Sequence, residues 1–227
     1  MKKRTAVIGA LVSMLPLGQP LVIGTGAVLM NAGMMLAIPD KAQADSADFY
    51  FKRAYDNAEE GDYYGAISDY TKVIEINPKS VSAYHNRAVA KIDLKDYSGA
   101  IVDLTKAIEM NPTDGDLYYN RGFAKNKLDD HYGAISDYTK VIEINPSNIY
   151  EAYARRGGSK HFLGDYSGAI SDFNKALEYK FPNRGGVFLL RGLSKEKLGD
   201  MNGACSDFRQ SYEFGWKDAM TWVQEKC

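Results

Sequence analysis

The stretch from Tyr84 to Pro112 reads YHNRAVAKIDLKDYSGAIVDLTKAIEMNP, and its pattern recurs along the chain. The Arg of this stretch is followed thirteen residues later by the Ala of a Gly-Ala pair. Five arginines begin the pattern: Arg53, Arg87, Arg121, Arg156 and Arg191. They are spaced by 34, 34, 35 and 35 residues. A period in this range indicates tandem repeats that stack on one another, and such arrays present extended surfaces that bind other molecules.

Each repeat is expected to form a helical hairpin. In the first half of the quoted stretch, Tyr84, Ala88 and Leu94 share one face at helical spacing, and Ala100 and Leu104 do so in the second half. An aspartate stands where it can cap the second helix of each repeat, at Asp62, Asp96, Asp130, Asp165 and Asp200. Asn-Pro pairs end the second helix at 77–78, 111–112 and 145–146, because Pro disfavours helical backbone in the residue before it.

This unit resembles the tetratricopeptide repeat (TPR), a helix-turn-helix with an early aromatic residue, small residues where the helices meet, and Pro near its end. The resemblance implies an all-α fold, a right-handed α-solenoid of five TPR-like hairpins with a C-terminal capping helix. The repeats span residues 47–80, 81–114, 115–149, 150–184 and 185–219. The capping segment, residues 216–227, overlaps the end of the fifth repeat, which lacks the closing Pro.

Residues 1–44 differ in kind from the repeats. A basic start, Met1 to Arg4, precedes a stretch without charged side chains, Thr5 to Pro39, and then the small-x-small sequence Ala42-Gln43-Ala44. This order predicts a secretory signal peptide that is cleaved near Ala44. The alternative is a retained membrane anchor formed by Leu21 to Ile38. Both alternatives export the repeats, to the periplasm or as a secreted protein, with the thylakoid lumen as a further option.

The chain has two cysteines, Cys205 and Cys227. In an exported protein they are expected to form a disulfide that holds the C-terminal tail on the last repeat. The alternative is that Cys205 serves as a small buried hydrophobic residue, since four repeats have Ile at its position.

Charge and motifs argue against several classes of function. The formal net charge is −1 and no basic stripe is visible, which argues against nucleic acid as a partner. The three histidines are scattered, and no Cys/His cluster has metal-ligand spacing. Neither a nucleophile motif nor a Gly-rich phosphate loop is present. The sequence therefore predicts no catalytic residues, no cofactor and no metal. Membrane contact is expected only through residues 1–44, if they are retained.

In every repeat an Asp lies sixteen residues after the Arg, at Asp69, Asp103, Asp137, Asp172 and Asp207. The arginines could form a basic row on a binding face, or they could pair with these aspartates to hold hairpins together. Repetition in all five units favours the structural interpretation. On this interpretation, Arg121→Ala should lower stability and leave partner affinity largely intact.

Residues that vary between repeats on an accessible face are the candidates for partner binding, because the repeated residues serve the fold. The resemblance places one such stripe of each first helix on a concave groove. The predicted partner-binding residues are Phe51, Tyr55, His85, Asn86, Val89, Tyr119, Asn120, Phe123, Asn126 and Arg155. Aromatic and Arg anchors with amide donors suit an extended peptide or a partner helix. The alternative is that Phe51, Tyr55 and Phe123 merely pack between hairpins.

The sequence therefore predicts a non-enzymatic scaffold or assembly factor outside the cytoplasm, which binds a protein or peptide. Two other functions stay open at this point. The chain could be a structural component of the cell envelope that associates with itself, or an accessory subunit of an exported enzyme.

Overall fold

The computed structural model describes residues 46–144, 149–179 and 184–227. The predicted export segment, residues 1–44, and the predicted helix stop at 145–146 lie outside the described residues. The described chain forms two compact units, one before and one after the boundary between Leu128 and Asp129. Throughout the described ranges the regular secondary structure is α-helix.

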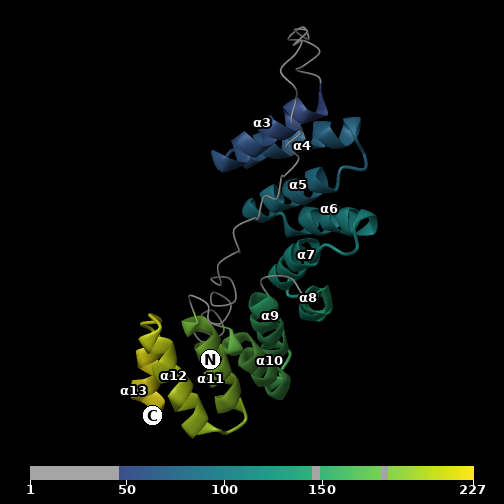
Figure 1. Cartoon of the computed structure of the whole chain (residues 1–227). Coiled ribbons are helices and arrows are strands. Elements are labelled where there is room, and N and C mark those ends of the chain that lie inside the picture. The colour runs from purple at the N-terminus through teal and green to yellow at the C-terminus, as the bar shows by residue number, and fades with distance from the viewer. Residues whose placement is uncertain (1–45, 145–148, 180–183) are drawn as a thin grey trace. The chain divides into compact units, whose positions relative to one another are not determined.

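The N-terminal unit contains the first two hairpins and the first helix of the third repeat. Its helices are α3 (Ala47–Glu59), α4 (Tyr63–Ile76), α5 (Val81–Asp93), α6 (Tyr97–Met110) and α7 (Gly115–Lys127). The first helices of the repeats, α3, α5 and α7, lie along one side of this unit, and α4 and α6 lie along the other (Figure 1).

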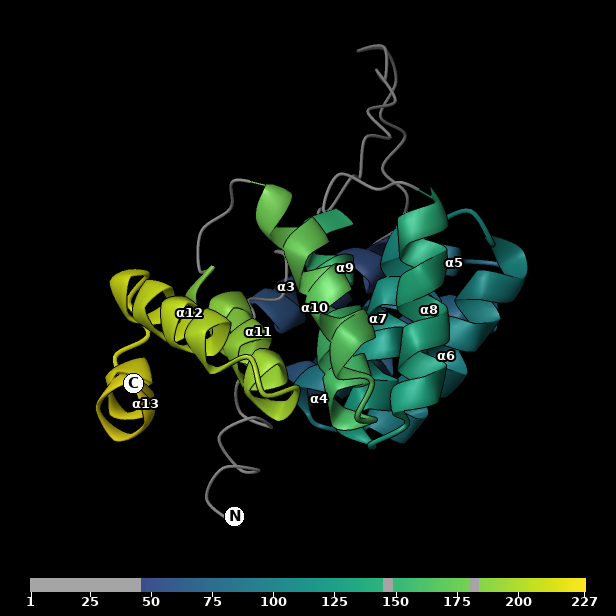
Figure 2. The ribbon, with the colours of Figure 1, turned by 90° about the horizontal axis from the view of Figure 1, so that it is seen from below.

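The C-terminal unit continues the same pattern. Its helices are α8 (His131–Ile144), α9 (Ile149–Phe162), α10 (Tyr166–Glu178), α11 (Gly185–Lys197), α12 (Met201–Glu213) and α13 (Ala219–Lys226). The hairpins α9–α10 and α11–α12 pack side by side, and α13 lies beside α12 (Figure 2). The expected all-α fold of helical hairpins with a terminal capping helix is therefore confirmed.

Aspartate caps begin the second helices, as the sequence predicted. Asp96 Oδ1 accepts a hydrogen bond from the backbone N–H of Gly99 at 2.9 Å, and the other four predicted caps make the same bond. The capping bond also explains why Gly recurs before Ala. A Cβ atom at Gly99 would overlap the carboxylate of Asp96, so only Gly fits beside this cap.

Small residues let the two helices of a hairpin approach closely. A Cβ atom at Gly157 would lie 2.9 Å from Cε1 of Phe173, and one at Gly192 would lie 2.7 Å from Cε1 of Phe208. Both distances are shorter than normal carbon–carbon contacts, so a larger residue would force the two helices of the hairpin apart. The predicted packing of small residues against aromatic rings is thus present in these two hairpins.

The repeated Arg and Asp form ion pairs between the two helices of a repeat. The structure gives this pair in the first, second, fourth and fifth repeats, between α3 and α4, α5 and α6, α9 and α10, and α11 and α12. The Arg also reaches back to the second helix of the preceding repeat. Arg87 Nη1 donates to Thr71 Oγ1 at 2.9 Å, and Arg156 Nη1 donates to Thr139 Oγ1 at 3.0 Å. The arginines therefore join helices within and between hairpins.

The C-terminal helix covers the end of the last hairpin. Trp222 of α13 packs with Phe208 and Leu189 in one buried cluster. A disulfide joins Cys205 of α12 to Cys227, and an ion pair joins Lys226 to Glu196. Among the described helices, none is long and apolar enough to span a bilayer.

Candidate partner-binding site

The candidate site lies on the first helices of the N-terminal unit. Side chains three or four residues apart share one face of a helix. We call the resulting surface the first-helix face. It consists of Asp48, Phe51, Tyr55 and Glu59 on α3, Ser82, His85, Val89 and Asp93 on α5, and Asp116, Tyr119, Phe123 and Lys127 on α7.

A hydrogen bond between two of the predicted residues joins neighbouring repeats at the edge of this face. Asn120 Nδ2 of α7 lies 2.8 Å from His85 Nε2 of α5. Because an amide nitrogen only donates, the histidine nitrogen is the acceptor and the imidazole is neutral. The side chains of His85 and Asn120 are both partly exposed. They thus present an ordered polar pair at the surface.

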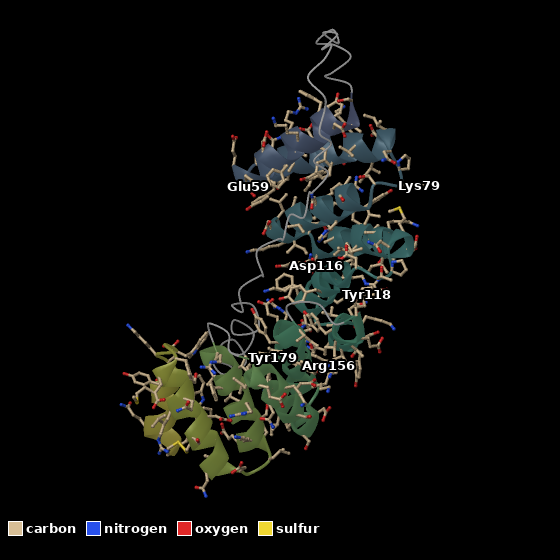
Figure 3. The ribbon with its side chains drawn as sticks, viewed as in Figure 1. Glu59, Lys79, Asp116, Tyr118, Arg156 and Tyr179 are labelled. Atoms are coloured by element: carbon tan, nitrogen blue, oxygen red, sulfur yellow. A yellow bond between two sulfur atoms is a disulfide. The ribbon has the colours of Figure 1, made fainter. Side chains whose placement is uncertain are left out.

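The electrostatic surroundings of His85 are consistent with a neutral ring. Burial is the main cause that lowers its pKa, and the nearby carboxylates of Asp114 and Asp116 oppose this effect. Asp114 caps α7 by accepting from the N–H of Asp116 at 3.0 Å. The pKa of Asp116 is raised, mainly by burial and secondly by Asp114. Figure 3 shows Asp116 near the start of α7.

The aromatic part of the face is anchored to the core of the first hairpin. Phe51 packs edge-to-face on Tyr70 with ring centroids 5.5 Å apart. Burial raises the pKa of Tyr70 to about 12. Tyr55 and Val89 are partly exposed beside this cluster. Phe51 therefore has a packing role in addition to its partial exposure, and Asn86 is partly exposed as well.

Phe123 does not offer the accessible anchor that the sequence predicted. Its side chain is 6% exposed, because it packs edge-to-face against Tyr97 and lies beneath Lys127 Nζ, which is 5.2 Å from the ring centroid. The alternative, in which an aromatic residue of the stripe packs between hairpins, therefore applies to Phe123. Asn126, one turn further, also has its Nδ2 atom buried.

Arg155 is also less accessible than the sequence predicted. It is 1% exposed, whereas the sequence placed it at the accessible edge of the groove. The reason is that α9 packs against α8, α10 and α11, which leaves few of its positions open. The stripe residues Glu151, His161, Leu189 and Leu193 of the last two repeats are buried as well. Within the described residues, the candidate site is therefore restricted to the N-terminal unit.

The buried His161 and Ser194 do not form a catalytic arrangement. Nδ1 of His161 lies 2.8 Å from Oγ of Ser194, but this hydroxyl donates to the carbonyl oxygen of Leu190 at 2.8 Å. Ser194 therefore accepts from the imidazole, the reverse of what activation of a nucleophile needs. Burial, with a smaller effect of Lys197, lowers the pKa of His161 to about 4. Among the described residues, no group of His, Cys, Asp and Glu is arranged to hold a metal ion.

The sequence reasoning missed two carboxylates of the face, Glu59 and Asp93. They lie four residues after Tyr55 and Val89, so the helical spacing that selected those residues was also the signal for the acids. The threonines that bond the arginines were also missed, although Thr71, Thr105 and Thr139 each stand two residues after the repeated Asp.

Four segments of the chain match models of one protein family. Models of the tetratricopeptide repeat match residues 47–80, 81–114, 115–148 and 150–183. No curated protein matches the chain.

Solved structures share the fold. A crystal structure of MamA protein is 25% identical, with a TM-score of 0.70 over 77% of this chain and 94% of that chain. YrrB, described as a TPR protein with an unusual peptide-binding site, is 21% identical with a TM-score of 0.70, over 82% of this chain and 94% of that chain. MamA from Desulfovibrio magneticus RS-1 is 17% identical, also with a TM-score of 0.70, over 74% and 94% of the two chains.

Proposed function

The chain belongs to the tetratricopeptide repeat family, and on this premise we propose that its first-helix face binds a peptide segment or helix of a partner protein. TPR arrays are protein-interaction scaffolds whose stacked hairpins present extended surfaces. The proposed role is non-enzymatic. In this role the array holds a partner or brings partners together.

The observation that carries the proposal is the hydrogen bond between His85 and Asn120. It joins two repeats at positions that vary along the array, whereas the repeated residues already have structural roles. Partly exposed Tyr119 follows on α7, and partly exposed Tyr55 and Val89 lie on α3 and α5. An ordered polar pair beside aromatic and aliphatic side chains matches the composition of peptide-binding surfaces.

The proposed location is outside the cytoplasm. The basic start and uncharged stretch of residues 1–44 support export, as does the small-x-small sequence that follows them. The disulfide between Cys205 and Cys227 supports it independently, because disulfides persist in oxidising compartments.

Site-specific photo-crosslinking tests the proposed binding face. The photoreactive residue p-benzoylphenylalanine replaces Val89 on the first-helix face in one variant and the 63% exposed Val102 of α6 in a control variant. After irradiation in the producing cells, the proposal predicts one dominant partner adduct at position 89 and none at position 102. Equal adducts at both positions, or an adduct at 102 alone, would contradict it. An adduct with a second copy of the chain would instead support the self-associating alternative.

A further inference from the structure

We propose that the segment bound on the first-helix face carries a basic side chain, Lys or Arg, which lies at Glu59 and Asp93. An apolar side chain of the same segment, next to the basic one, packs against Tyr55 and Val89. This inference rests on the proposed function and specifies the chemistry of the partner.

Several acidic residues of the N-terminal unit have a role in the fold. Asp69 and Asp103 pair with the repeated arginines, Asp62 and Asp96 cap helices, and Glu109 pairs with Lys106. Four exposed acids on the first-helix face have no such role: Asp48, Glu59, Asp93 and Asp116. None of these four has an ion-pair partner among the described residues.

Two of these four acids are placed against the preference of their helices. Glu59 is the last residue of α3 and Asp93 is the last residue of α5. The C-terminus of a helix carries partial negative charge, so a carboxylate there lowers helix stability. Asp48 and Asp116, by contrast, lie in first turns, where a carboxylate is favourable. Helix stability therefore does not account for Glu59 and Asp93.

The surroundings of these two carboxylates suit a cation. The pKa of Asp93 is raised by burial, so its ionised form lacks the stabilisation that a counter-ion would give. Glu59 is exposed at the end of α3, and it contributes, much less than burial does, to raising the pKa of the Tyr70 hydroxyl. A cation from a partner would offset the negative charge at the ends of both helices.

The residue of α7 that corresponds to Glu59 and Asp93 is basic. It is Lys127, whose ammonium group lies above Phe123. A basic side chain of the partner is therefore attracted to the ends of α3 and α5 and repelled at the end of α7. Tyr55 and Val89 lie one turn before the two acids, where an apolar neighbour of that basic side chain can pack.

Fluorescence anisotropy with two matched peptides tests the inference on the full chain at low ionic strength. One labelled nonapeptide has two leucines flanked by two lysines, and the other has glutamates in place of the lysines. The face variant is Glu59→Gln/Asp93→Asn. The control variant, Glu60→Gln/Glu75→Gln, removes two exposed charges outside the face.

The lysine peptide should bind wild type and the control within about twofold, and the face variant about five- to tenfold more weakly. The glutamate peptide should bind wild type at least tenfold more weakly than the lysine peptide does. An equal loss in the control, equal binding of both peptides, or no binding of the lysine peptide would overturn the inference.

A second measurement separates this inference from the proposed function. The partner captured at position 89 is titrated against wild type and Glu59→Gln/Asp93→Asn. A five- to tenfold weaker affinity supports the basic segment. An unchanged affinity overturns it, while the adduct at position 89 leaves the proposed function intact.

Discussion

Arg87 binds both carboxylate oxygens of Asp103, from Nε to Oδ2 at 2.9 Å and from Nη2 to Oδ1 at 2.7 Å. Lys91 Nζ adds a contact of 2.7 Å to the same carboxylate. Through its third nitrogen, Nη1, Arg87 donates to Thr71 on α4. One arginine thus connects α4, α5 and α6, and Arg156 makes the equivalent bonds to α8 and α10.

Replacement of Arg87 by Ala should lower the free energy of unfolding by about 2–4 kcal/mol. The reason is that the buried carboxylate of Asp103 keeps only Lys91 as a counter-ion. Urea unfolding followed by circular dichroism measures the loss. Lys106→Ala is the matched control, because it breaks the exposed pair with Glu109 and should leave the free energy of unfolding almost unchanged. Similar losses in both variants would show that the Arg–Asp pair has no special role.

The stability of the chain should fall in acid through His161. Its folded pKa is lowered to about 4, while an unfolded histidine has a pKa of about 6.5, so the unfolded state binds more protons between these values. Stability is therefore fully present above about pH 6.5 and is lost progressively toward pH 4, by about 3 kcal/mol in all. His161→Gln should show a shallower dependence in the same range. Parallel curves for wild type and variant would contradict the assignment.

The disulfide should stabilise the C-terminal end of the chain. Cys205 and Cys227 are 22 residues apart, and closing a loop of this length contributes about 3 kcal/mol. Cys227→Ser should lower the melting temperature and speed amide exchange in α13. A dithiol reductant should have the same effect on wild type and none on the variant, and an effect on both would point to another cause.

Replacement of Lys95 by Gly should raise the stability of the chain. Lys95 has φ = 63°, a left-handed conformation, and the equivalent turns of three other repeats have Gly61, Gly164 and Gly199. Since a side chain disfavours this conformation, Lys95→Gly should raise stability by about 0.5–1 kcal/mol. Gly164→Ala is the reciprocal variant and should lower stability by about 1 kcal/mol. A destabilised Lys95→Gly variant would mean that contacts of the Lys95 side chain outweigh the cost of its left-handed backbone conformation.

Much of the fold was predictable because the period of the repeats reports on local structure. The aspartate caps and the small residues between helices follow from residue type and spacing within one hairpin. The pairing of Arg with Asp sixteen residues later was predictable for the same reason. The bonds from Arg87 to Thr71 and from Arg156 to Thr139 cross between repeats, so no pattern within one hairpin reveals them.

The site was predictable only in part, since accessibility depends on neighbouring helices. Helical spacing placed Phe123 on the same stripe as His85, and Arg155 at the edge of the groove. It carries no information on how closely Tyr97 approaches Phe123, or on the three helices that pack against α9. The link between His85 and Asn120 joins residues 35 positions apart, and it depends on how two repeats stack.

The affinity of the cross-linked partner for two tyrosine variants tests the central claim most directly. Tyr119→Ala changes the first-helix face, and Tyr64→Ala removes a tyrosine that is 75% exposed on α4. Calorimetric titration, with melting curves to show that both variants are folded, should give a Kd about 10- to 30-fold higher for Tyr119→Ala. For Tyr64→Ala the Kd should stay within about twofold of wild type. Equal affinities for wild type and Tyr119→Ala, or a larger loss for Tyr64→Ala, would contradict binding on the first-helix face.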